Sequence, residues 1–238
     1  MQAYAIQEKL DLMAISESAL KSKIGNEKVE IDGYSIIRND LVNSQRCGGV
    51  LLYYKNNLSV KNRPDLQFPN TIIAEITISR KKLFFILSYR RPSQSDQEFT
   101  NYCQLLKDLL DKINNENPFM TVLTGDYNAK NSSWYSGDKT DKYGLAINDI
   151  FSSNALFQIV DQPTNITATS HHYIDLVATD HTNIIIQNEI APSLDPNCHH
   201  QINLVKLNLK CQPPPPYKRL VYHLSLIHIS EPTRRVLI

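Results

Sequence analysis

The sequence lacks the features of several protein classes. Its four cysteines are widely separated and form no Cys-x-x-Cys pair, so neither a structural zinc site nor a dense disulfide framework is indicated, and a reducing compartment is the default expectation. No stretch approaches about 18 consecutive apolar residues, and the N-terminus lacks the pattern of a secretory signal. We therefore expect an intracellular protein of the nucleus or cytoplasm that does not associate with membranes.

An excess of charge of one sign is also missing. The 238 residues carry a formal net charge of +1 and are 42% hydrophobic, which fits one globular domain with a real core. This balance argues against nonspecific coating of nucleic acid. A local basic strip could still bind a phosphate-containing substrate, and its candidates are Arg80, Lys81, Lys82, Arg90 and Arg91. For the first three, an exposed hairpin turn is the favoured alternative.

The pattern of apolar residues predicts runs of strands interspersed with a few helices. Ser95 and Glu98 form a capping-box motif before an amphipathic helix over residues 96–115. A second helix is predicted over 142–153 and a short one within 1–10. Strands are predicted at 11–16, 34–38, 48–54, 71–79, 83–89, 119–126, 157–160, 173–178, 184–189 and 202–209. Short spacing implies antiparallel pairing, and the whole pattern suggests two packed sheets with helices outside.

The most informative segment is the apolar strand at 119–126, which ends in Asp126 with Asn128 two residues later. Residues i and i+2 of an extended chain share a face, so both side chains can converge on one ligand at the carboxyl end of a buried strand. A carboxylate can hold a hard cation or orient a water, and an amide can donate to a phosphate oxygen. An ordinary Asx-rich turn is the alternative.

The domain organisation is predicted to have three parts. Residues 1–210 are one domain, and residues 211–223 are a Pro-rich linker because proline lacks the backbone donor that helix or sheet requires. Residues 224–238 look like the in-frame translation of a sequencing adapter, so we leave them out of the functional argument.

Four further stretches place a polar side chain at the end or start of a strand. They are 11–17 with Glu17, 88–92 with Tyr89, 170–176 with Asp175, and 197–202 with His199. Together with Gly125-Asp126-Tyr127-Asn128, in this order and at these spacings, they resemble the endonuclease/exonuclease/phosphatase superfamily. The nearest likeness is to the endonuclease domain of non-long-terminal-repeat retrotransposons, and it covers roughly residues 1 to 210.

Further short motifs carry the likeness to the retrotransposon domain. They are Gly48-Gly49-Val50, Trp134 after the Gly-Asp-Tyr-Asn-Ala run, Gln162-Pro163-Thr164, and Ile174-Asp175-Leu176 after Ser170. The resemblance implies an α/β fold with a two-sheet sandwich flanked by helices, four-layered and deoxyribonuclease-like. The family's first core strand, which supplies a metal-binding Asn, should precede Met1, so we expect an N-terminally truncated domain.

The resemblance also implies roles for the residues at the strand ends. Glu17 would be a ligand of Mg²⁺, with Mn²⁺ as an alternative ion, and Tyr89 would donate its hydroxyl to a phosphate oxygen, although packing on the sheet is nearly as good an explanation. Asp126 would orient or deprotonate the attacking water, and Asn128 would hold that water or the phosphate. His171 and His172 fit loop residues better than ligands of a hard cation.

The remaining pair implied by the resemblance is Asp175 with His199. Asp175 would accept a hydrogen bond from one ring nitrogen, and the other nitrogen would stabilise charge on the scissile phosphate. His200, one position later, is the alternative to His199. We favour His199 because Gln201 and Ile202 then begin the following strand in the expected register. In that register Cys198 stands where the family's Ser-Asp-His has a carboxylate. The choice of general base between Asp126 and the His199–Asp175 pair stays open.

These roles imply a magnesium-dependent phosphodiesterase that nicks DNA during retrotransposition, with a reverse transcriptase domain in the parent polyprotein. Two alternatives remain. One is a catalytically inactive translated fragment of such an element, suggested by Cys198 and the expected missing strand. The other is a phosphoesterase of the same fold that acts on a small phosphorylated substrate.

Overall fold

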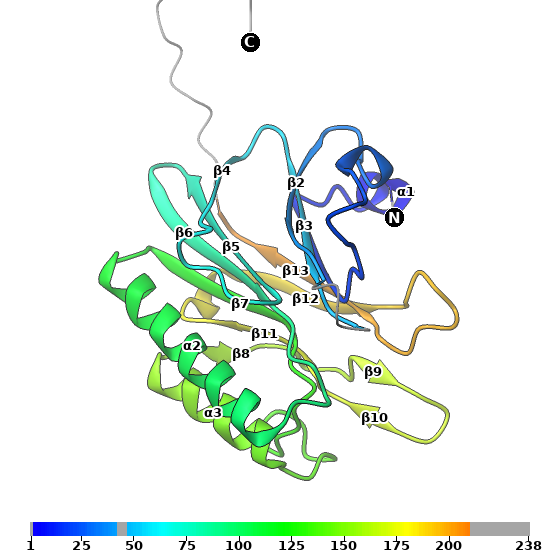
Figure 1. Cartoon of the computed structure of the whole chain (residues 1–238), viewed down its shortest axis with the longest axis vertical. Helices are drawn as coiled ribbons and strands as arrows, with labels where there is room; N and C mark the ends of the chain where they lie inside the picture. The colour runs from blue at the N-terminus through cyan, green and yellow to red at the C-terminus, as the bar shows by residue number, and fades with distance from the viewer. Residues whose placement is uncertain (1, 42–46, 210–238) are drawn as a thin grey trace, which may run out of the picture.

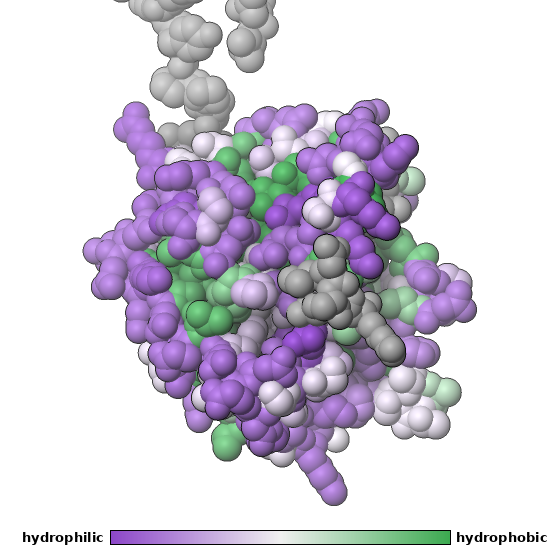
Figure 2. All heavy atoms as spheres, in the orientation of Figure 1, coloured by the Kyte–Doolittle hydropathy of each residue, from purple (hydrophilic) through white to green (hydrophobic). Residues whose placement is uncertain are grey.

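Two layers of β-strands pack face to face, and two helices cover the outer face of the larger sheet (Figure 1). The computed structural model describes residues 2–41 and 47–209. The predicted linker at 211–223 and the adapter-like segment at 224–238 lie outside the described residues. Polar side chains cover most of the face in view, and apolar residues appear there in separate patches (Figure 2).

The larger sheet has six strands in the order β4-β5-β6-β7-β11-β8. Their bounds are β4 Ser59–Asn62, β5 Thr71–Ile78, β6 Lys81–Ser88, β7 Met120–Asp126, β8 Phe157–Gln158 and β11 Asp175–Thr179. Among the strands that the structure describes, only β6 and β7 pair in parallel, and the helix α2 (Asp96–Asn115) connects them. Parallel neighbours require such a crossover, which brings the carboxyl ends of β6 and β7 to the same edge of the sheet.

The helices α2 and α3 (Lys142–Ser153) form as the sequence predicts. Ser95 accepts a hydrogen bond from the Glu98 amide while the Glu98 carboxylate accepts one from the Ser95 amide, which completes the capping box. The apolar stripe of α2 is buried against the six-stranded sheet, where Leu106 and Ile113 are fully inaccessible to solvent. This packing is what keeps the β6–β7 crossover in place.

The second layer consists of two separate pieces. One is the sheet β1-β3-β2 and the other is the pair β12-β13, with bounds β1 Leu12–Ser16, β2 Tyr34–Asn39, β3 Val50–Lys55, β12 Ile185–Ala191 and β13 Ile202–Leu207. Both pieces pack on the same face of the larger sheet. β1 lies against β6 and β7, while Asn203 of β13 donates to the Asp175 carbonyl of β11 at 3.1 Å. Among the described strands, β1 is an edge strand of its three-stranded sheet, and β13 pairs only with β12.

The outer face of the second layer is covered by the short helix α1 (Gln2–Gln7) and by the segment containing the 3₁₀ turn η1 (Asn26–Lys28). Ala5 is fully buried, and Ile31 packs with Leu51 and Tyr53 in a small cluster. The architecture is thus the predicted α/β sandwich with covers on both sides. No described helix is long and apolar enough to cross a membrane, and the three described cysteines are free.

The predicted strands all form, most with shifted ends, and the structure adds three short ones. β4 completes the edge of the larger sheet, while β9 (Asn165–Ile166) and β10 (His171–His172) form a small hairpin beside the site described below. A 3₁₀ turn, η2 (Thr182–Ile184), precedes β12. Strands of two residues leave no periodic pattern, so sequence alone does not reveal such a hairpin.

Candidate active site

Two carboxylates face each other at one edge of the larger sheet. Asp126 is the last residue of β7 and Asp175 is the first residue of β11, and the antiparallel register places them directly opposite each other. Side chains at such paired positions lie on the same face of the sheet. The predicted convergence of Asp126 and Asp175 on one site is therefore present.

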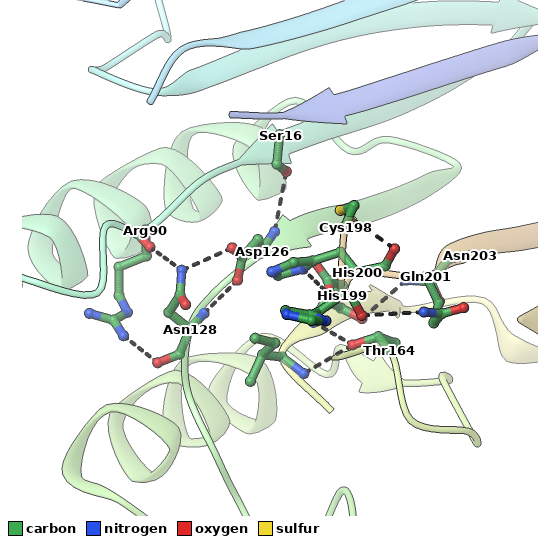
Figure 3. Close-up of polar contacts among 12 residues, drawn as sticks. Ser16, Arg90, Asp126, Asn128, Thr164, Cys198, His199, His200, Gln201 and Asn203 are labelled. Atoms are coloured by element: carbon green, nitrogen blue, oxygen red, sulfur yellow. Dashed lines mark hydrogen bonds and ion pairs between the residues drawn. The ribbon is translucent and has the colours of Figure 1, made fainter. Parts of the chain in front are cut away.

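The Asp126 carboxylate is buried, with the residue only 3% exposed. Its Oδ1 accepts from the Asn128 amide and its Oδ2 from Asn128 Nδ2, both at 2.9 Å (Figure 3). Its own amide donates to Ser16 Oγ at 3.4 Å, which links β7 to the end of β1. Burial, and next the negative charge of Asp175, raise the pKa of Asp126 to about 7. This carboxyl group can exchange a proton near neutral pH.

Asn128 holds Asp126 in place. It adopts a left-handed conformation with φ of 46°, which asparagine tolerates better than most residues. Its two side-chain hydrogens go to Asp126 Oδ2 and to the Arg90 carbonyl, each at 2.9 Å. Both donors are therefore in use, and Oδ1 is the side-chain atom left to accept from a water.

Arg90 organises the same loop from inside the protein. The residue is 1% exposed, and its guanidinium donates to the carbonyls of Tyr127 and Asn128 and, at 2.9 Å, to that of Arg91. Its backbone amide donates to the Asp126 carbonyl at 2.9 Å. The predicted basic strip is therefore wrong at Arg90, because this side chain is committed to buried carbonyls and unavailable to a substrate.

The other part of the predicted strip lies at the opposite end of the sheet. Ser79 and Arg80 both have positive φ and form the turn between β5 and β6, which matches the favoured hairpin alternative. Lys81 lies over the Phe119 ring, and Lys82 pairs with Glu116 at 2.9 Å. Because β6 runs from this turn towards Asp126, these cations cannot act at the site together with Arg91.

The predicted pairing of Asp175 with His199 is wrong, because His200 takes that place. His200 Nδ1 lies 3.0 and 2.9 Å from the two carboxylate oxygens of Asp175, whereas the His199 side chain is exposed (Figure 3). The Asp175 hydrogen bond is the main reason that the pKa of His200 is raised, to about 9. In this register His199, rather than Cys198, stands where the family pattern has its carboxylate.

Backbone pairing to Thr164 explains the one-residue shift. The Gln201 amide donates to the Thr164 carbonyl at 2.7 Å, and Asn165 forms a β-bridge with His200. Thr164 is fully buried, and its hydroxyl accepts from the Asp175 amide at 2.9 Å. One threonine thus fixes both Asp175 and His200, and these contacts between distant segments decide which imidazole turns inward.

Glu17 and Tyr89 complete the site at the ends of β1 and β6. Glu17 follows β1 with φ of 52° and is exposed. Tyr89 is 1% exposed, and its hydroxyl makes no hydrogen bond of ordinary geometry to a described residue, although the Glu17 carboxylate and the Cys47 thiol lie near it. Burial, and next the nearby Glu17 carboxylate, raise the pKa of Tyr89. A buried hydroxyl without a hydrogen bond of ordinary geometry is costly, so it marks a position where a bound ligand can accept a hydrogen bond.

The loop that carries Glu17 is fixed by Gly48 and Gly49. The amides of Ser18 and Ala19 donate to the carbonyls of Gly49 and Gly48, each at 3.0 Å. Both glycines have positive φ, and Gly49 donates to Asn70 Oδ1 at 2.8 Å. The Gly48-Gly49 motif therefore positions the loop that carries Glu17.

The site offers suitable groups for a divalent cation. Ligand atoms of Asp126, Asp175 and His200 lie within 4.8 Å of one another. The imidazole already bonds Asp175, and Mg²⁺ prefers oxygen ligands, so the carboxylates fit this ion better than the ring does. Glu17 makes no ion pair in the described part of the chain, and its negative charge acts on both Tyr89 and Asp126. The carboxylate set is compatible with a hard divalent ion.

Several supporting residues were missed from the sequence. Ser16, Arg90 as a buried anchor, and Asn203 all act through contacts between segments far apart in the chain, and no local pattern marks them. Thr164 was noted only as part of the Gln-Pro-Thr motif. Its complete burial and its hydrogen bonds to Asp175 and Gln201 explain that motif physically.

Comparisons with known proteins identify the family and the fold of this chain. The family model described as endonuclease-reverse transcriptase matches residues 83–202, half of the 238-residue chain. No curated protein matches the sequence. The endonuclease domain of TRAS1, a telomere-specific non-LTR retrotransposon, superposes with a TM-score of 0.70 at 16% identity, covering 87% of this chain and 90% of that one.

Two further solved structures share the fold. The AP endonuclease LMAP from Leishmania major has a TM-score of 0.67 at 11% identity, covering 84% of this chain and 79% of that one. The 3′ phosphatase NExo from Neisseria, bound to a product DNA hairpin, has a TM-score of 0.62 at 11% identity, covering 87% and 94%. With this fold and the family match, the chain belongs to the endonuclease-reverse transcriptase family of the endonuclease/exonuclease/phosphatase superfamily.

Proposed function

We propose that this domain is a divalent-metal-dependent phosphodiesterase that nicks one strand of DNA. The observation that carries the proposal is the pairing of Asp126 and Asp175 across β7 and β11, with His200 bonded to Asp175. The buried Asp126 carboxylate, the partly buried Asp175 carboxylate, a protonated imidazole and the buried Tyr89 hydroxyl meet at one edge of the sheet. Attack of water on phosphorus needs such a base and such donors.

Asp126 serves as the general base in this proposal. Its pKa of about 7 leaves a substantial fraction ionised at neutral pH, where it can take a proton from the attacking water. His200 has a pKa of about 9 and is therefore protonated under the same conditions. A protonated ring is an acid rather than a base, which is why we assign the role of base to Asp126.

His200 and Tyr89 stabilise the charge that develops on the phosphate. Asp175 holds the imidazolium through Nδ1, which leaves Nε2–H to donate to a phosphate oxygen. The Tyr89 hydroxyl, which lies near Glu17, donates to another phosphate oxygen in this proposal. Asn128 keeps Asp126 oriented through its two contacts to the carboxylate. Donors placed before the reaction lower the barrier without reorganisation.

Glu17 is the residue proposed to hold Mg²⁺, or Mn²⁺ in its place. Its exposed carboxylate fits an ion that takes one or two carboxylates together with waters and phosphate oxygens. The ion would supply charge neutralisation at the scissile phosphate. The Asp126 and Asp175 carboxylates add negative charge that also attracts cations to the site.

DNA is the proposed substrate, because the fold is shared with two endonucleases and with a 3′ phosphatase bound to a product DNA hairpin. A nick that leaves a 3′-hydroxyl could prime reverse transcription, and we propose a reverse transcriptase domain in the parent polyprotein, with residues 1–210 as the endonuclease unit. This role would place the protein with nucleic acid inside the cell.

Nicking of supercoiled plasmid tests the proposal. We expect the wild-type protein to convert supercoiled DNA to open circles with Mg²⁺, to stop on addition of EDTA, and to leave ends that a DNA polymerase extends directly. Asp111→Asn, an exposed change on α2, is the matched control and should keep full activity.

Other results would contradict the proposal. Turnover that persists in EDTA would rule out the metal. Faster cleavage of small phosphoesters than of DNA would favour the small-substrate alternative. A folded protein with no turnover on any substrate would favour the inactive alternative.

A further inference from the structure

A second aspartate–histidine pair lies outside the residues assigned above. Asp138, in the loop after β7, has a side chain that is 1% exposed, and its Oδ1 lies 2.6 Å from Nδ1 of His172 in β10. The Tyr173 amide also donates to Asp138, at Oδ2 and 3.3 Å. The second ring nitrogen of His172, Nε2, lies 2.9 Å from Lys130 Nζ. The imidazole is therefore held between a buried carboxylate and an ammonium group.

The chemistry of the two neighbours fixes the roles of the ring nitrogens. An ionised carboxylate only accepts hydrogen bonds, so Nδ1 carries the proton that goes to Asp138. An ammonium group only donates, so Nε2 accepts from Lys130. His172 then bridges the Asp138 carboxylate and the Lys130 ammonium group, so the buried Asp138 determines where Lys130 lies.

Lys130 is unusual because its ordered ammonium group contacts no carboxylate. Across residues 2–41 and 47–209 it forms no ion pair, and its contact with His172 uses only one of three N–H donors. Ordering a lysine side chain costs up to about 2 kcal/mol of entropy. A half-buried cation held in this way is a prepared donor for an anion.

Lys130 and His172 belong to the segments that follow β7 and precede β11, the strands that carry the two carboxylates. Lys130 follows Asn128 by two residues, and His172 precedes Asp175 by three. The Tyr127 amide donates to the Ile174 carbonyl at 2.9 Å, which continues the β7–β11 pairing in their direction. Four residues span at most about 14 Å of extended chain. That is the length of a few nucleotides, since one strand rises about 3.4 Å per phosphate.

We propose that Lys130 binds a non-scissile phosphate of the DNA strand, and that the Asp138–His172 pair positions it. The inference rests on the proposed function, because a phosphodiester backbone entering the Asp126 site supplies further phosphates at this distance. Lys130 is thus a substrate-binding residue, whereas His172 and Asp138 are positioning residues.

The salt dependence of DNA binding tests this subsite. Binding of a labelled duplex is measured in EDTA between 50 and 200 mM salt, where each phosphate contact contributes roughly 0.9 to the slope of log K against log salt. We expect Lys130→Met to lower the slope by about one contact and Lys130→Arg to restore it. His172→Ala should weaken binding by less than Lys130→Met does. The control Lys112→Met removes an exposed charge from the last turn of α2 and should leave the slope unchanged.

Plasmid nicking by the same proteins separates the two proposals. For Lys130→Met we expect a higher KM with kcat within twofold of wild type. A wild-type slope in Lys130→Met, together with normal nicking, would overturn the subsite and leave the proposed function intact. If the wild-type protein binds DNA and the variants change the slope as expected, but none of the proteins nicks DNA, the subsite would be supported and the proposed function contradicted. A wild-type protein that binds no DNA would overturn both.

Discussion

Replacing Asp126 with asparagine should stabilise the folded protein at alkaline pH while removing the proposed base. Burial raises the folded-state pKa of this carboxyl group from its ordinary value to about 7. Its contribution to stability is therefore fully present below the unfolded pKa, near pH 4, and is lost as pH rises through about 7. The asparagine variant has no carboxylate to ionise, so it escapes this loss.

The size of the effect follows from the pKa shift. A shift of roughly three units corresponds to about 4 kcal/mol when the group is fully ionised in both states, as at pH 8. At pH 5 the Asp126 carboxyl group is protonated in the folded protein, and the raised pKa lowers the free energy of unfolding by less than about 2 kcal/mol. The amide at position 126 also loses one hydrogen bond to Asn128, which costs about 1 kcal/mol at either pH. The effect of Asp126→Asn on the free energy of unfolding should therefore differ by about 2 to 3 kcal/mol between pH 5 and pH 8, and this difference does not depend on the lost hydrogen bond.

Urea unfolding at pH 5 and pH 8 measures the difference. We expect the free energy of unfolding of Asp126→Asn, relative to wild type, to be higher at pH 8 than at pH 5. Because Asp126 also raises the pKa of His200, the comparison is repeated in a His200→Gln background. Asp111→Asn, an exposed change, should show equal values at both pH values. An equal effect of Asp126→Asn at both pH values would refute the raised pKa.

Three further predictions concern the same edge of the sheet. The nicking rate should rise through about pH 7 as Asp126 ionises and fall above about pH 9 as His200 loses its proton, and a profile without the alkaline limb would contradict the role of His200. Gly125→Ala places a Cβ 1.7 Å from the Ser88 carbonyl oxygen at φ of 141°, so thermal unfolding should show a loss of roughly 3 kcal/mol or more. Gly33→Ala, with φ of 84° and no heavy atom within 4 Å of the new Cβ, should cost only about 1 kcal/mol. Arg90→Met should lose about 3 kcal/mol and most activity, because three carbonyls lose a donor; wild-type nicking by this variant would contradict its anchoring role.

Local sequence signals predicted the elements that depend on local chemistry. The capping box predicted where α2 begins, and the apolar stripe predicted which of its side chains are buried, because both signals lie within the helix and its cap. The apolar run of β7 predicted where Asp126 emerges. Helix α2 and strand β7 both depend on burial and on hydrogen bonds between near neighbours in the chain.

The contacts between distant segments could not be predicted in this way. The choice between His199 and His200 depends on Thr164, more than 30 residues away, which pairs with Gln201. A strand register that moves by one residue turns the opposite side chain inward, so an error of one position changes the assigned residue. The buried role of Arg90 likewise depends on the Tyr127 and Asn128 carbonyls, which lie far from it in sequence.

The most direct test of the central claim compares the two adjacent histidines in plasmid nicking under single-turnover conditions. His200→Gln should lower the rate by roughly 10² to 10⁴, the usual range for loss of one positioned acid or base. His199→Gln should keep a rate close to that of wild type. Equal losses in both variants, or a larger loss in His199→Gln, would contradict a site built on Asp126, Asp175 and His200.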